Sequence, residues 1–182
     1  MSRATTPGGS NGGGAASSGR VARRWIDAVM QEGDWATAWL LSDAPFRLAQ
    51  VQAWIWPQRG EPELVSESLD DVAASMCEEG PAHPLWEDFA AVVLETYHRT
   101  WQEFDLSRWA VAARSRPMGP GYEVVVYTRE EGAIVPDGET LYVARPFLMH
   151  RTAGTWLVAH AGSNKLPVPG WPPEFPEASW EG

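Results

Sequence analysis

Hydrophobic residues in the first half of the chain recur with the spacing of an α-helix. Val21, Trp25 and Val29 form the stripe of a first helix, which Gly33 ends. Asp34 is placed to cap a second helix, WATAWLLS, because its carboxylate can accept hydrogen bonds from the free amides of the first turn. The pattern therefore predicts two consecutive helices before residue 43.

Two further helices have recognisable ends. Asp43 is placed to start FRLAQVQAWIW, which Pro57 stops. Ser68 and Asp71 have the spacing of a capping box, and the short helix that they open ends at Gly80. These signals predict helices on both sides of an acidic loop.

Pro84 opens a long amphipathic helix. Its apolar side carries Trp86, Ala90, Val93, Tyr97, Trp101 and Phe104, and its polar side carries Glu87, Glu95, Arg99 and Gln102. A helix with this pattern is expected to lie flat on an apolar surface.

Beyond Asp105 the pattern changes to alternation, which is typical of strands. Four segments are rich in Val, Tyr, Trp and Thr: RWAVAARS, GYEVVVYTR, TLYVARPFLMHR and TWLVAHAG. The segments PMGPG, EEGAIVPDG and AG separate them as turns and loops. Helices followed by a meander predict an α+β fold, with N-terminal helices packed on a curved four-stranded antiparallel sheet.

We expect a single domain over residues 21–162. The two ends of the chain differ from this domain in composition. Residues 1–20 have no apolar period, so they are expected to form a disordered leader. Residues 163–182 are rich in proline, which disfavours helix and strand. Their aromatic residues predict a tail that packs on the body.

The formal net charge of −10 is unevenly placed. From Gly60 to His98 there are ten carboxylates and no lysine or arginine. Such a field repels phosphate backbones, so we expect no nucleic-acid partner. The acidic segment either docks a basic protein partner or is solvated charge that keeps the protein in solution.

The remaining composition predicts a cytoplasmic protein without membrane attachment, metal or cofactor. The leader lacks the apolar core of a secretory signal, and no apolar run approaches the roughly 20 residues of a membrane helix. Cys77 is the single cysteine, which excludes an internal disulfide and a thiolate zinc cluster. The glycines of the leader lie in no strand-to-helix context, so they predict no phosphate-binding loop.

The final hairpin carries Gly154 at its turn, Trp156 two residues on and His160 four beyond that. With the segment EGDWATAW and the long helix before the meander, the order of elements from Val21 to Gly162 resembles the nuclear transport factor two-like superfamily. Its cone-shaped fold is shared with ketosteroid isomerases and polyketide cyclases. The resemblance implies a cone-like domain with a central apolar cavity. Residues 58–83 depart from the family pattern, because they indicate an acidic loop and a helix where the family usually has a strand pair.

A two-residue turn at 153–154 pairs Met149 with Val158 and Phe147 with His160. One face of the hairpin is then expected to carry Arg145, Phe147, Met149, Trp156, Val158 and His160. His150 falls on the opposite face, so the two histidines are not expected to share a metal ion.

The chemistry that the resemblance implies needs a titratable group between apolar walls and a donor that can hold an oxyanion. The candidate catalytic residues are His160, as acid or base, with Arg145 and Tyr127 orienting the ligand. The alternative is a structural histidine, with Arg145 bound to a carboxylate at the sheet edge. His150 lies close to a turn and is expected to be exposed. The strands contain no aspartate, which argues against a steroid-isomerase mechanism.

The most unusual feature of the composition is its eleven tryptophans. Trp25, Trp86 and Trp101 lie on helical stripes and are expected in the core. The tryptophans that either line a pocket for a flat ligand or also belong to the core are Trp35, Trp39, Trp54, Trp56 and Trp109. The candidate ligand-binding residues are Trp39, Trp109, Phe147, Met149 and Trp156.

Two functions are expected. The first, which the resemblance implies, is a small-molecule pocket protein of the polyketide cyclase or dehydratase type, which binds or acts on an apolar, polycyclic ligand. The second is a non-catalytic interaction module that uses the acidic segment and the proline-rich tail. A homodimer is expected because the outer face of such a sheet needs covering.

Overall fold

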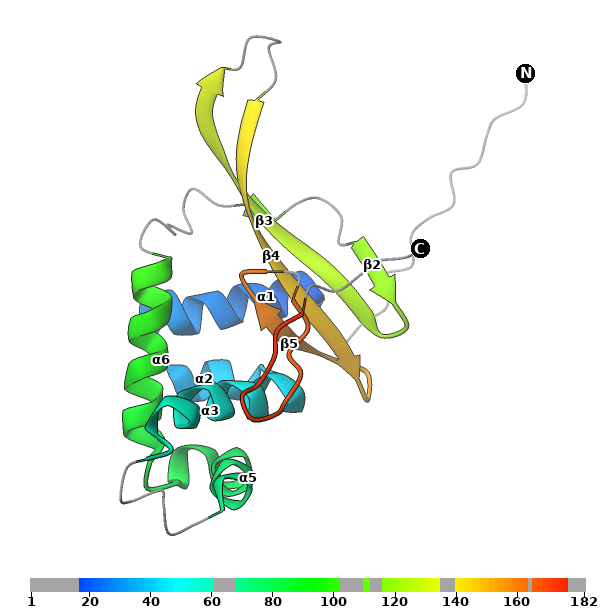
Figure 1. Ribbon diagram of the computed structural model, residues 1–182. Coiled ribbons are helices and arrows are strands. Elements are labelled where there is room, and N and C mark those ends of the chain that lie inside the picture. Colours follow the sequence, from blue (N-terminus) through cyan, green and yellow to red (C-terminus); the bar gives the residue numbers. More distant parts are fainter. Residues whose placement is uncertain are drawn as a thin grey trace, which may run out of the picture.

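The computed structural model of the chain is shown in Figure 1 and describes residues 17–60, 68–101, 110–111, 116–134, 140–163 and 165–176. The helical segments are α1 (Ser18–Asp27), η1 (Ala28–Glu32), α2 (Trp35–Leu40), α3 (Ala44–Gln58), α5 (Leu69–Glu79), η2 (Gly80–Ala82) and α6 (Trp86–Thr100). The strands are β1 (Ala110–Val111), β2 (Arg116–Gly119), β3 (Tyr122–Ile134), β4 (Thr140–Thr152) and β5 (Thr155–Ala161). Helices precede an antiparallel sheet, so the predicted α+β class is confirmed.

Capping contacts explain where the helices begin. Asp34 Oδ1 accepts a hydrogen bond from the Thr37 amide at 2.9 Å, and Asp43 Oδ1 accepts one from the Phe46 amide at 2.9 Å. Both caps satisfy amides that have no partner within the helix. Ser68 stands before α5, but its side chain makes no capping hydrogen bond. The predicted capping box was therefore wrong, although the helix starts at the predicted place.

Some boundaries differ from the prediction. α1 begins at Ser18, earlier than expected, because the Ser17 hydroxyl accepts a hydrogen bond from the Arg20 amide at 3.4 Å. Most of the expected leader, residues 1–16, lies outside the described residues. α3 continues through Pro57 to Gln58, so the proline lies in the last turn and not beyond it.

The sheet has the order β1-β3-β4-β5, and β2 pairs with β3 on the edge that β1 also uses. The segment PMGPG was predicted as a turn, but most of it forms β2. The segment EEGAI was predicted as loop and instead extends β3 to Ile134. As a result, β3 and β4 form a long twisted hairpin that projects beyond the helices (Figure 1).

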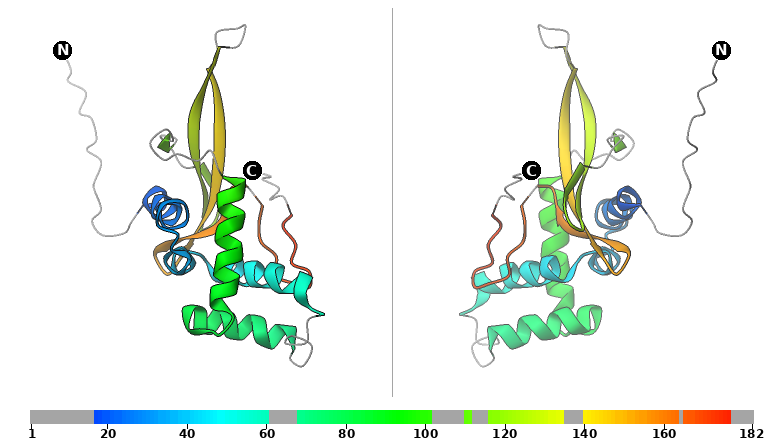
Figure 2. Two further views of the ribbon diagram at one scale, coloured as in Figure 1. Left: turned by 90° about the vertical axis from the view of Figure 1, so that its left-hand side faces the viewer. Right: turned by 90° about the vertical axis from the view of Figure 1, so that its right-hand side faces the viewer.

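The sheet separates two parts of the chain. In the side views, α1 and α2 lie on one side of the β3–β4 hairpin and the segment 165–176 lies on the other (Figure 2). α3 leads from the first side towards the second (Figure 2). Just before α3, Ser42 forms a parallel bridge with Val158 of β5. The edge of β5 is thereby joined to the helical layer.

Aromatic rings fill the space between α1, α6 and the sheet. The centroid of the Trp25 ring lies 5.2 Å from that of Tyr97, 5.9 Å from that of Phe147 and 6.1 Å from that of Trp101. The indole N–H of Trp25 donates to Ser42 Oγ at 3.0 Å. The largest fully buried aromatic side chains are Trp25, Trp39, Tyr127, Phe46, Phe89 and Phe147. The predicted core positions of Trp25, Trp86 and Trp101 are confirmed, since each is at most 5% exposed.

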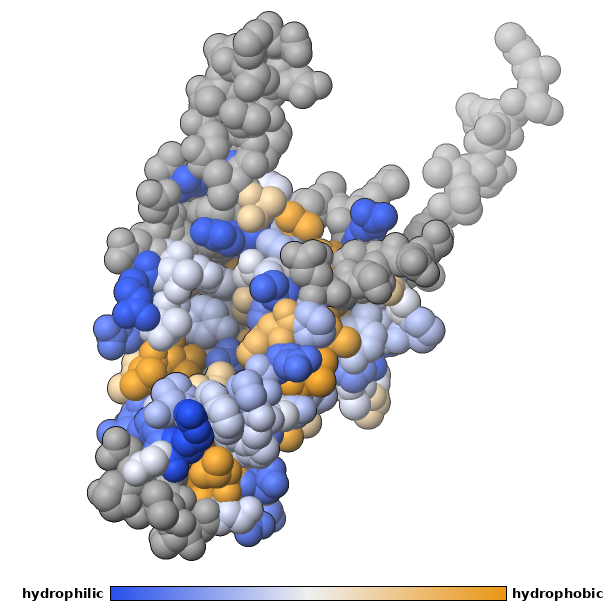
Figure 3. Space-filling model, viewed as in Figure 1, coloured by the Kyte–Doolittle hydropathy of each residue, from blue (hydrophilic) through white to orange (hydrophobic). Residues whose placement is uncertain are grey.

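Exposed large hydrophobic side chains among the described residues are Leu40, Val92, Leu166 and Val168. On the face seen in Figure 3, apolar side chains form separate patches bounded by polar ones. Within the described ranges no helix combines the length and apolarity that a membrane span requires.

Candidate functional site: a cavity at the end of β5

A β-bulge in the β4–β5 hairpin decides where His160 points. Near the turn the predicted register holds, but Ala159 is an extra residue in β5. His160 therefore pairs with Leu148, and the predicted partner, Phe147, pairs with Ala161 instead. The predicted pair of Phe147 and His160 was wrong because the sequence gives no signal for a bulge at this alanine.

The bulge also brings both hairpin histidines to one face of the sheet, contrary to the prediction. Paired residues project to the same side, so His160 lies on the side of Leu148. His150 follows Leu148 by two residues in β4 and lies on that side too. Across the described residues, no group of three or more His, Cys, Asp or Glu side chains is arranged to hold a metal ion.

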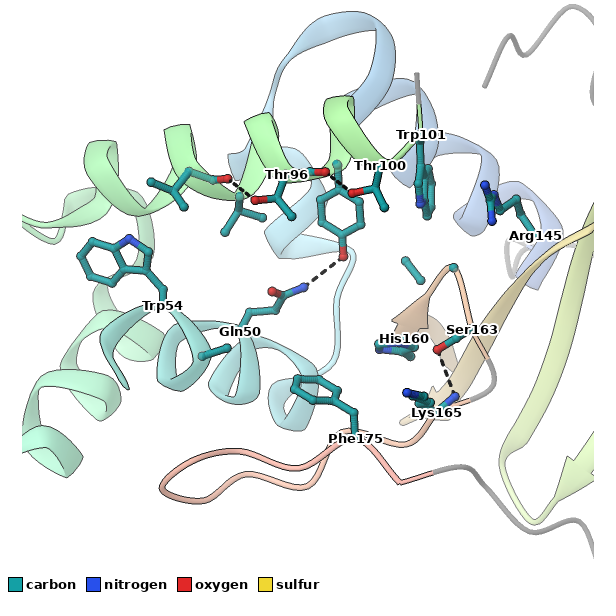
Figure 4. Close-up of a pocket in the computed structure, with 16 residues that line it drawn as sticks. Gln50, Trp54, Thr96, Thr100, Trp101, Arg145, His160, Ser163, Lys165 and Phe175 are labelled. Carbon is teal, nitrogen blue, oxygen red and sulfur yellow. Dashed lines mark hydrogen bonds between the residues drawn. The ribbon is translucent and has the colours of Figure 1, made fainter. Parts of the chain in front are cut away.

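A cavity of about 660 Å³ lies where β5 ends, between α3, α6 and the segment 165–176 (Figure 4). Its walls are mostly aromatic, aliphatic or uncharged polar side chains, and Arg145, His160 and Lys165 supply the basic groups. Figure 4 shows Trp54 at one end and Arg145 and Lys165 at the other. The volume is in the range of small-molecule sites, which is about 300 to 1,000 Å³.

His160 contributes a neutral imidazole to this cavity. Its ring lies between Phe46 and Phe175, with centroid distances of 5.4 Å and 5.8 Å. Its Nδ1 is buried and has no hydrogen-bond partner among the described residues. Burial, and to a smaller extent the charge of Lys165, lowers the pKa of His160 to about 4. Near pH 7 the ring is therefore uncharged, with one donor and one acceptor nitrogen.

Arg145 is partly buried on β4 and lines the same cavity. Its guanidinium forms no hydrogen bond or ion pair with the described residues, so the alternative of a carboxylate partner at the sheet edge is not observed among them. Lys165 is exposed at the cavity margin, and its backbone amide donates to Ser163 Oγ at 3.3 Å. The structure thus brings two of the three candidate catalytic residues, His160 and Arg145, to one cavity.

Tyr127, the third candidate, does not line this cavity. Its side chain is fully buried, and its hydroxyl donates to the Gly19 carbonyl oxygen of α1 at 3.2 Å. Burial raises the pKa of Tyr127 to about 12. In this structure the Tyr127 hydroxyl holds α1 to the sheet and does not orient a ligand beside His160.

The candidate ligand-binding residues lie elsewhere. Phe147, Met149 and Trp39 are buried in the core, each at most 2% exposed. Trp156 is partly buried against the same core, and Trp109 lies outside the described residues. The rings that do line the cavity are those of Trp54, Trp101 and Phe175, together with Tyr97. Of the tryptophans expected to line a pocket, Trp54 does so, and the other rings of the lining come from residues that were not expected there.

Gly162 allows Trp101 to form part of the wall. It has a φ of +89°, which disfavours other residues, and a Cβ at this position would lie 2.9 Å from Cζ2 of the Trp101 ring. Any larger residue would displace the indole from the end of α6.

The segment 165–176 closes one side of the cavity because it is fastened to α3 and α5. The Gly170 amide donates to Gln52 Oε1 at 2.9 Å, and the Trp171 indole N–H donates to Asp70 Oδ1 at 2.6 Å. These contacts hold Phe175 against the His160 ring.

A second polar cluster lies at the other end of the same sheet face. His150 Nδ1 lies 3.2 Å from Asp43 Oδ2, and its ring stacks on Tyr122 with centroids 4.3 Å apart. The His150 side chain is 27% exposed, so the expectation of an exposed histidine was wrong. Burial raises the pKa of Asp43, and hydrogen bonds from Phe46 and His150 oppose that shift. The cluster joins the start of α3 to β4.

Sequence reasoning missed Lys165, Phe175 and Asp43 as members of these clusters. Lys165 is the single lysine of the chain, which is the one signal that could have marked it. The other two are brought into place by the return of the tail and by the bridge between Ser42 and Val158.

No protein-family model, curated protein or solved structure matches this chain. The resemblance to the nuclear transport factor two-like superfamily therefore stays a prediction, as do the homodimer, the basic partner and the cytoplasmic location.

Proposed function

We propose that this protein binds a small, largely apolar molecule in the cavity at the end of β5. The observation that carries the proposal is a cavity of about 660 Å³ whose walls combine the rings of Trp54, Trp101 and Phe175 with polar side chains. Sites for small molecules typically have this composition, in which apolar walls supply affinity and a few polar groups fix orientation. The fastened segment 165–176 supports the proposal, because it holds Phe175 in place as one wall of the cavity.

Binding is the part of the polyketide cyclase-like hypothesis that the geometry favours. An acid–base reaction near pH 7 works best with a group whose pKa lies near that pH. With a pKa of about 4, His160 carries little imidazolium there and is a poor proton donor. We therefore propose that His160 orients the ligand by a hydrogen bond, and that turnover is not required for the function.

The neutral fluorescent probe N-phenyl-1-naphthylamine tests the proposal, because its emission rises when it leaves water for an apolar site. We expect saturable binding to the wild-type protein. Thr96→Trp places an indole in the cavity wall and should weaken binding at least tenfold, a change of about 1.4 kcal/mol.

Glu95→Trp is the matched control, since Glu95 is the exposed neighbour of Thr96 on α6 and does not line the cavity. It should bind the probe like wild type. Circular dichroism establishes that both variants fold. Equal binding by the two variants, or no binding by wild type, contradicts the proposal and leaves the interaction-module hypothesis.

A further inference from the structure

We infer that the molecule bound in this cavity carries a carboxylate or a similar anionic group, held by Arg145 and Lys165 at the end of the cavity opposite Trp54. This inference rests on the proposed binding function and adds the chemical class of the ligand.

Arg145 gives the first argument. A guanidinium that is partly removed from water loses hydration, and proteins usually compensate this loss with a carboxylate or another acceptor. Among the described residues Arg145 has no such partner. Its planar fork of donors matches the two oxygens of a carboxylate, so a ligand anion would supply what the chain does not.

The charge balance of the cavity gives the second argument. Its described lining contains Arg145 and Lys165 and no Asp or Glu. The chain as a whole carries a formal net charge of −10, so a local excess of two cations runs against its composition. Opposite charges attract each other more strongly beside apolar rings such as those of Trp101 and Phe175 than in bulk water.

The hydroxyl groups on α6 give the third argument, because they limit where an anion can lie. The Thr96 hydroxyl donates to the Val92 carbonyl oxygen at 2.8 Å, and the Thr100 hydroxyl donates to the Thr96 carbonyl oxygen. Both hydroxyls use their protons within the helix and present only acceptors to the cavity. An anion is therefore favoured at the end of the cavity that Arg145 and Lys165 line (Figure 4).

A pair of probes that differ only in charge tests the inference: 2-naphthoate and its methyl ester. Dissociation constants are measured by displacement of N-phenyl-1-naphthylamine at two salt concentrations. Wild type should bind the acid at least tenfold more tightly than the ester, and added salt should weaken only the acid. Arg145→Met should weaken binding of the acid by roughly 10- to 100-fold and that of the ester by less than threefold.

Lys165→Met should weaken binding of the acid by roughly three- to tenfold, since this ammonium is more exposed. Arg99→Met is the matched control, because Arg99 is an exposed α6 residue outside the cavity lining. It removes the same formal charge and should leave both constants unchanged.

The outcomes separate the two proposals. If acid and ester bind wild type equally, or if Arg145→Met affects both alike, the anionic ligand is overturned and the apolar binding function stands. The same holds if only N-phenyl-1-naphthylamine binds. If none of the probes binds, both proposals fail.

Discussion

The two ends of one sheet face carry a histidine each, and the two histidines have opposite surroundings. At one end, His150 contacts the Asp43 carboxylate and stacks on Tyr122, so its polar and ring surfaces are both used within the chain. At the other end, His160 has a buried Nδ1 without a partner among the described residues, and it lines the cavity that Arg145 also lines. Among the described residues, His150 Nδ1 has a partner at the first end and His160 Nδ1 has none at the second, so we call them the complete end and the incomplete end.

The presence or absence of a hydrogen-bond partner within the chain distinguishes the two histidines, although their residue type is the same. Buried polar atoms in folded proteins are nearly always hydrogen-bonded, so an exception needs a physical reason. Nδ1 of His160 is such an exception, and the proposed ligand would contact the part of the ring that faces the cavity. At the His150 end, the contacts explain the histidine through the attachment of α3 to β4, and no ligand is needed.

The largest effect is expected at the complete end. Asp43→Ala removes the cap of α3 and the partner of His150, and it leaves the Phe46 amide unsatisfied. We expect a loss of about 3 kcal/mol in the free energy of unfolding, measured by urea denaturation.

Asp43→Asn is the control, because its amide oxygen can still accept a hydrogen bond from the Phe46 amide. This variant should lose no more than half of the free energy of unfolding that Asp43→Ala loses. Both variants should bind N-phenyl-1-naphthylamine like wild type if they fold. A binding defect in Asp43→Asn would break the distinction between the two ends.

An intermediate effect is expected from pH at the incomplete end. The folded-state pKa of His160 is about 4, below its ordinary value of 6.5. As the pH falls from 6.5 towards 4, the unfolded chain takes up a proton at this residue and the folded chain does not, so stability present above pH 6.5 is lost. Between pH 7 and pH 5, the protonation of His160 in the unfolded chain should lower the free energy of unfolding by about 2 kcal/mol.

His160→Gln isolates that contribution, since the other titrating groups are common to both proteins. Between pH 7 and pH 5, the free energy of unfolding of the variant should fall by about 2 kcal/mol less than that of wild type. Urea denaturation at each pH measures this difference. Parallel curves for wild type and variant would show that His160 is not held neutral by its surroundings.

The smallest effect is expected where the tail is fastened over the cavity. Trp171→Phe keeps a ring near Trp56 but removes the N–H that donates to Asp70. The loss of stability should be about 0.5 kcal/mol, because the contact is exposed. Stopped-flow dissociation of N-phenyl-1-naphthylamine should be two- to threefold faster.

Asp70→Asn keeps an acceptor at this site and should show a smaller change. An unchanged dissociation rate in Trp171→Phe would mean that the segment 165–176 does not control access to the cavity.

The sequence by itself determined the class of fold and much of the core. Helical and alternating hydrophobic patterns are local properties of the chain, so they placed the helices, the antiparallel strands and the buried stripe of Trp25, Trp86 and Trp101. Capping residues such as Asp34 and Asp43 could be recognised because a cap acts on amides within one turn.

Only the tertiary structure decided the site. The extra residue Ala159 shifted His160 to the face of His150, and no local pattern marks such a bulge. Phe147 and Met149 went to the core, while Phe175 and Lys165 reached the cavity through contacts with α3 and α5 more than 90 positions away in sequence. Which polar groups remain without partners depends on these long-range contacts, and a one-dimensional pattern does not contain them.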